Sequence, residues 1–92
     1  MEEEIKYKKE IEEYRKRFNE IIDRVETAKS VEELKSLREE ELAVLKELKE
    51  KYSDEKHRVI FDAIRDLLRY FSYGYFDRLR ELTGSAPHWH FY

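Results

Sequence analysis

Histidines near the end of this 92-residue chain are the side chains whose type and spacing most suggest chemistry. His88 and His90 stand two residues apart, and imidazole nitrogens are common ligands of zinc, copper and nickel. Asp54 and His57, one helical turn apart, would add a second pair of ligands. We expect the two pairs at opposite ends of one helix, so neither reaches the ligand number of a metal site. We therefore predict no metal ligands and no cofactor, and keep metal binding through the C-terminal histidines as an alternative.

An acidic residue within an apolar stripe is the second unusual feature. Glu41 falls among leucines and valines, one turn after Arg38. An unpaired buried carboxylate costs several kcal/mol, so such a group normally pairs with a cation. We predict that Glu41 pairs with Arg38 or with an arginine of the third helix such as Arg65 at the edge of the core; a functional acid is the alternative. No nucleophile with a base and no paired carboxylates stand out, so we predict no catalytic residue and a protein that is not an enzyme.

Composition points to long helices in one small domain, residues 1–92. The chain has two glycines, one proline and no cysteine, and charged residues make up 45% of it. These values favour an all-α class and exclude an all-β fold and disulfide or thiolate chemistry. The net charge of −3 argues against broad adhesion to nucleic acid or membranes. Without a signal sequence or a long apolar run, we expect a soluble, cytoplasmic protein.

Apolar residues recur at helical spacing in three segments, which we place at residues 2–29, 31–52 and 54–83. A capping box of Ser30 and Glu33 begins the second segment. Short connections predict an antiparallel three-helix bundle with an aromatic C-terminal tail. Gly74 weakens the third helix, so a break there is the alternative to a continuous helix that ends at Gly84. The expected core is Ile11, Phe18, Ile21, Val25, Leu34, Leu45, Leu48, Ile60, Ile64, Leu67 and Phe71, and the apolar arc of the second helix also includes Leu42.

The third helix carries more apolar residues than one neighbouring helix would cover. Beside its main stripe lies a second line, which consists of Val59, Ala63, Tyr70 and Tyr73. We predict that these four residues bind a protein partner or a second copy of the chain, because tyrosine offers a large contact area with a polar tip. The alternative is ordinary packing, with the first helix on one side of the third and the second helix on the other.

A short basic and aromatic strip also follows the third helix. It consists of Arg58, Arg65, Arg69, Arg80 and Phe76. Such a strip would suit a phosphate backbone. Asp62 lies within it, so we expect a solvated face and treat nucleic-acid association as an alternative. The tail residues Trp89, Phe91 and Tyr92 are expected to fold back over the end of this helix.

The segment Thr27-Ala28-Lys29-Ser30-Val31-Glu32-Glu33-Leu34, the Glu, Lys and Arg content and the Thr83-Gly84-Ser85 ending resemble computationally designed helical bundles. Idealised caps and heptads are what design heuristics prescribe. The resemblance covers residues 2–85 and implies a helical scaffold. Small proteins of hyperthermophiles share the Glu and Lys enrichment and are the rival interpretation. Seven tyrosines, a glycine within a helix and the His-Trp-His tail depart from idealised practice.

Overall fold

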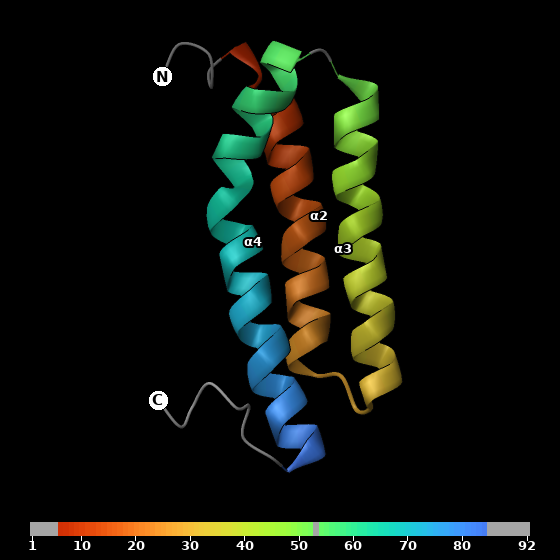
Figure 1. Ribbon diagram of the computed structural model, residues 1–92. Helices are drawn as coiled ribbons and strands as arrows, with labels where there is room; N and C mark the ends of the chain where they lie inside the picture. The colour runs from red at the N-terminus through yellow and green to blue at the C-terminus, as the bar shows by residue number, and fades with distance from the viewer. Residues whose placement is uncertain (1–5, 53, 85–92) are drawn as a thin grey trace, which may run out of the picture.

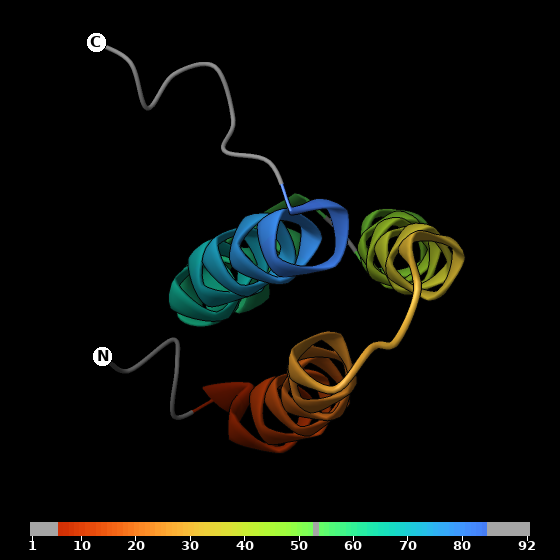
Figure 2. The same ribbon diagram turned by 90° about the horizontal axis from the view of Figure 1, so that it is seen from below.

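Three helices form the part of the protein that the computed structural model describes, residues 6–52 and 54–84. They are α2 (Lys8–Glu26), α3 (Val31–Lys51) and α4 (Asp54–Thr83). α2 and α4 run in the same direction. α3 follows α2 in the chain, precedes α4 and runs in the opposite direction (Figure 1). Viewed along the helices, the three lie at the corners of a triangle (Figure 2). The predicted all-α, antiparallel three-helix bundle is thus confirmed. No described helix has the length and apolar content needed to cross a bilayer.

The predicted capping box begins α3. The Oγ atom of Ser30 accepts a hydrogen bond from the backbone N–H of Glu33 at 3.1 Å. The Glu33 carboxylate in turn accepts from the backbone N–H of Lys29 at 3.1 Å, one residue earlier than the cap amide that an ideal box would use. The Ser30 hydroxyl therefore satisfies an amide of the first turn that the helix itself leaves unpaired, and Glu33 satisfies an amide of the preceding loop. The predicted cap of the third helix, Ser53, lies outside the described residues.

α4 is continuous through Gly74, which confirms the first of the two expectations for this helix. It ends at Thr83 and is followed by Gly84, where φ is +69° and the backbone N–H donates to the carbonyl of Arg80 at 2.8 Å. A glycine in the left-handed region is the common way to end a helix. At 30 residues α4 exceeds the 21 of α3, and its C-terminal end extends past the loop that joins α2 and α3 (Figure 1).

The core lies along the axis of the bundle, and ten of the eleven residues expected there are buried; the eleventh, Leu45, is partly buried. Tyr14 joins them at 1% exposure. Leu42, expected on the apolar arc of α3, is 51% exposed. Glu41, its neighbour, takes the inward position instead.

One polar contact links the far end of α4 to the loop between α2 and α3. The Nε–H of Arg78 donates to the backbone carbonyl of Ala28 at 2.7 Å. Ala28 is itself buried, so this carbonyl would otherwise be shielded from water without a partner. The contact fixes the loop against α4. The tail residues His88, Trp89, His90, Phe91 and Tyr92, for which metal binding and helix cover were considered, lie outside the described residues.

Candidate protein-binding surface

The four residues predicted to bind a partner occupy different environments. Val59 is 4% exposed and belongs to the core, and Ala63 is partly buried. Tyr70 and Tyr73 are 58% and 61% exposed. The four residues therefore do not form one exposed face, and the expectation that Val59 contributes to one is wrong.

The reason is the position of α2. Arg15 of α2 donates a hydrogen bond to the backbone carbonyl of Ala63 at 2.6 Å, so α2 covers the side of α4 on which Ala63 and Val59 lie. Packing against α2 thus accounts for Val59 and Ala63, as the alternative of ordinary helix packing predicts. Tyr70 and Tyr73 lie about two and about three turns farther along α4 than Ala63, outside this contact.

An exposed aromatic row remains on α4, and it consists of Tyr70, Tyr73 and Phe76. Phe76 is 38% exposed and was expected among arginines on a basic strip instead. The spacing of three residues is the signal that places it with the tyrosines, because side chains at i and i+3 are neighbours on a helix surface. Rows of this spacing are inclined at about 45° to the helix axis. The aromatic row therefore crosses the outer face of α4 obliquely.

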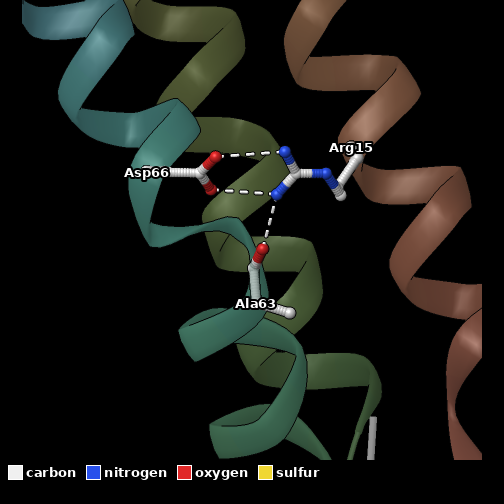
Figure 3. A network of polar contacts seen from close by, with 3 residues as sticks. All are labelled: Arg15, Ala63 and Asp66. Atoms are coloured by element: carbon white, nitrogen blue, oxygen red, sulfur yellow. Dashed lines mark hydrogen bonds and ion pairs between the residues drawn. The ribbon is translucent and has the colours of Figure 1, made fainter. Parts of the chain in front are cut away.

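Figure 3 shows a bidentate ion pair between Arg15 and Asp66, the residue one turn before Tyr70. The two terminal nitrogens of Arg15 donate to both carboxylate oxygens of Asp66, at 2.9 and 3.0 Å. Hydrogen bonding from Arg15 lowers the pKa of Asp66, and the same bond raises the pKa of Arg15. Asp66 precedes Tyr70 by one turn, so the row begins beside a neutralised and geometrically fixed pair.

Charges of opposite sign lie on the two sides of the aromatic row. At 3.6 residues per turn, Arg69 and Arg65 fall on one side of Tyr73, and Asp77 and Glu81 fall on the other. All four of these charged residues are exposed. The outer face of α4 is thus an oblique aromatic row between a basic side, named for Arg65 and Arg69, and an acidic side, named for Asp77 and Glu81. Asp62 and Asp66 also lie on the basic side and Arg80 on the acidic side, each in an ion pair.

Several of these charges already have partners within α4. Arg65 lies 3.5 Å from Asp62, Arg80 lies 3.1 Å from Asp77, and Arg78 lies 3.0 Å from Glu81. Each pair is solvent-exposed on at least one member, and such pairs contribute at most about 1 kcal/mol. They can exchange partners at little cost. They also neutralise part of the basic strip on which the nucleic-acid alternative rests.

Glu41 is the buried acid of the bundle, at 6% exposure. Of the two predicted partners, Arg38 is the one it meets, with Nε 3.7 Å from the carboxylate. The guanidinium also lies over the ring of Tyr75, 5.9 Å from its centroid, and so links α3 to α4. Burial raises the pKa of Glu41, and the charge of Arg38 only partly opposes that effect. The carboxylate faces the core without the two-armed support that Asp66 receives.

The remaining candidates for chemistry are His57, clusters of metal ligands and the surface hollows. His57 stacks against Phe61, with ring centroids 5.8 Å apart, which is a packing role. Within residues 6–52 and 54–84, no three side chains of His, Cys, Asp or Glu gather as metal ligands. Two open hollows lie between α2 and α3 and are lined mainly by charged side chains such as Arg24, Glu33, Arg17 and Glu47.

Comparison with known families, with curated proteins and with solved structures finds no match for this chain. Function is therefore inferred from the aromatic row and its surroundings.

Proposed function

We propose that this protein is a non-enzymatic helical scaffold that binds protein through the aromatic row of α4. The observation that carries the proposal is the exposure of Tyr70 and Tyr73, 58% and 61% of each residue, next to each other on a regular helix. Exposed large aromatic side chains at helical spacing are typical of contact surfaces, where tyrosine is enriched relative to the rest of a protein surface.

The surroundings of the row favour binding at low entropic cost. Tyr70 and Tyr73 belong to a 30-residue helix whose other side packs in the core through Leu67 and Phe71. The ion pair of Arg15 with Asp66 holds this part of α4 to α2. A surface on a rigid element loses little conformational freedom on association, so more of the contact energy appears as affinity.

A catalytic role has less support. The open hollows between α2 and α3 hold no nucleophile paired with a base, and Glu41 has an arginine neighbour and no acid beside it within hydrogen-bond distance. Association with nucleic acid is the second candidate, carried by Arg69 and by the arginines near it. The acidic side of the same face, Asp77 and Glu81, opposes a phosphate backbone.

Site-specific photo-crosslinking tests the proposal. A photoreactive phenylalanine analogue in place of Tyr73 should form covalent adducts with protein in the native cell, whereas the same analogue in place of Lys16, exposed on α2, should form few. Adding Tyr70→Ala to the Tyr73 probe should reduce the adducts. Equal labelling from both positions, or labelling unaffected by Tyr70→Ala, would refute a binding role for the row.

A further inference from the structure

We infer that the partner of the aromatic row is a second copy of this chain, with the two α4 helices crossing near a right angle and their rows aligned. This inference rests on the proposed function and names its partner. It is carried by the arrangement of charge around the row: the basic side holds Arg65 and Arg69, and the acidic side holds Asp77 and Glu81. The basic side of the row on one copy can therefore meet the acidic side of the row on another copy.

The spacing of these residues is symmetric about Tyr73. Arg69 precedes it by four residues and Asp77 follows it by four; Arg65 precedes it by eight and Glu81 follows it by eight. A helix rises 1.5 Å and turns about 100° per residue. Residues at equal sequence distance before and after Tyr73 therefore lie at equal distances on opposite sides of the aromatic row.

A two-fold axis parallel to the row brings these opposite charges together. Under this symmetry Tyr73 meets Tyr73 of the second copy, and the basic side of each copy meets the acidic side of the other. Arg69 then faces Asp77 of the second copy, twice in the dimer. Because the row is inclined at about 45° to the helix axis, aligning two rows makes the helices cross at about 90°. Such a self-complementary patch is the form of a two-fold interface.

Arg69 and Asp77, at the centre of this interface, can each bind an opposite charge on the second copy. Arg69 is exposed and forms no ion pair with the described part of the chain. The Asp77–Arg80 pair is exposed at both members, 67% and 37%, so Asp77 can accept a second cation. Asp66, by contrast, is held by Arg15, and the arrangement leaves that bidentate pair outside the predicted charge contacts.

The small size of the row sets the strength of the dimer. Three aromatic side chains and their flanking charges form a patch below the size of a standard interface, in the class of weak and transient contacts. Such contacts have dissociation constants of roughly 10 µM to 1 mM. The protein should therefore be a monomer at low micromolar concentration and partly dimeric at a few hundred micromolar, so measurements at high concentration are needed.

Charge reversal tests the geometry. In sedimentation velocity over about 10 µM to 1 mM, Arg69→Asp alone and Asp77→Arg alone should each weaken the dimer about tenfold or more, because each places like charges together twice. An equimolar mixture of these two variants should dimerise about as well as the unaltered protein, since both contacts in the mixed dimer join unlike charges. The double variant should also regain the dimer. Lys16→Asp, a charge reversal on an exposed site of α2, should have no effect.

Two further measurements keep the result interpretable. Circular dichroism establishes that each variant retains its helix content, and Tyr73→Ala should weaken the dimer about tenfold, a loss of ~1.4 kcal/mol on the usual conversion. A monomer throughout the concentration range, a dimer insensitive to Tyr73→Ala, or single variants not rescued by mixing would overturn the inference. If the unaltered protein is monomeric while the photoreactive probe at position 73 still captures other proteins, the proposed function stands and the second copy is the wrong partner.

Discussion

Arg15 of α2 and Asp66 of α4 form a bidentate polar contact between two helices of this bundle. Both terminal nitrogens of the guanidinium bind the carboxylate, and one of them also donates to the carbonyl of Ala63 at 2.6 Å. Three hydrogen bonds from one side chain define both the distance and the register between two parallel helices. The bidentate geometry is one that only arginine supplies.

We therefore expect Arg15→Lys to destabilise the protein by about 1 kcal/mol, although charge is retained, because a lysine ammonium cannot bind both carboxylate oxygens and the carbonyl together. Urea unfolding followed by circular dichroism measures the change. Arg24→Lys is the matched control, since Arg24 makes a single hydrogen bond to Glu40, at 2.9 Å. Equal losses in the two variants would show that the geometry of the Arg15 contact has no special value.

Glu41→Leu should leave stability at pH 7 unchanged or raise it, because Leu keeps the apolar contacts and removes a buried charge supported only by Arg38. Denaturant unfolding measures the difference. A loss above ~2 kcal/mol would show instead that the carboxylate is required where it lies.

Because Glu41 is buried, we also expect its contribution to the stability of the protein to depend on pH. Burial raises the pKa of Glu41 in the folded protein above its ordinary value of 4.5. The folded state then binds the proton more tightly than the unfolded state, so this group lowers stability as pH rises from about 4.5 through the raised pKa. Glu41→Gln, which stays neutral, should gain stability relative to the unaltered protein at pH 7 and lose that gain at pH 3. A gain that is the same at both values would contradict this account.

Glu47 should make stability depend on pH with the opposite sign. Hydrogen bonds from Arg17, at 2.6 Å, and from the buried Tyr14 hydroxyl, at 2.8 Å, lower its pKa in the folded state. The stabilisation is therefore complete above the ordinary glutamate value and is lost as pH falls through the lowered pKa. Thermal melts between pH 2 and pH 5 should show a shallower loss of stability for Glu47→Gln than for the unaltered protein. An unchanged slope would mean that Glu47 ionises alike in both states.

The sequence predicts the three helices because the signals are local, although the first helix ends at Glu26 and not at the predicted residue 29. The spacing of apolar residues defines each helix, and Ser30 accepts from the amide of Glu33 in the first turn of α3 while Glu33 accepts from the amide of Lys29 just before it. The antiparallel order follows from the short connections. These features need no knowledge of which helices contact one another.

Assignments that depend on neighbouring helices are less accurate. Leu42 falls on a broad apolar arc in the sequence, but burial in α3 follows Leu34, Leu37, Glu41, Val44 and Leu48, at alternating spacings of three and four. These buried residues orient α3, and Leu42 is one residue away from that line. A helical wheel likewise places Val59 and Tyr70 near the same side of α4, yet α2 reaches Ala63 and leaves Tyr70 exposed. Tertiary contacts decide which part of an apolar face stays free.

The two glycines of the chain should respond to alanine in opposite ways. Gly74 lies within α4, and a Cβ atom there would sit 3.7 Å from Cγ1 of Val25, an ordinary van der Waals distance. Gly74→Ala should therefore stabilise the protein by about 1 kcal/mol, the difference between glycine and alanine in a helix interior.

Gly84 has φ of +69°, a conformation that alanine adopts only with strain. Gly84→Ala should destabilise by about 1 kcal/mol or shorten α4 at its end. Denaturant unfolding of both variants under one set of conditions checks the pair, and a destabilising Gly74→Ala would mean that α2 and α4 pack more closely at Val25 than this distance allows.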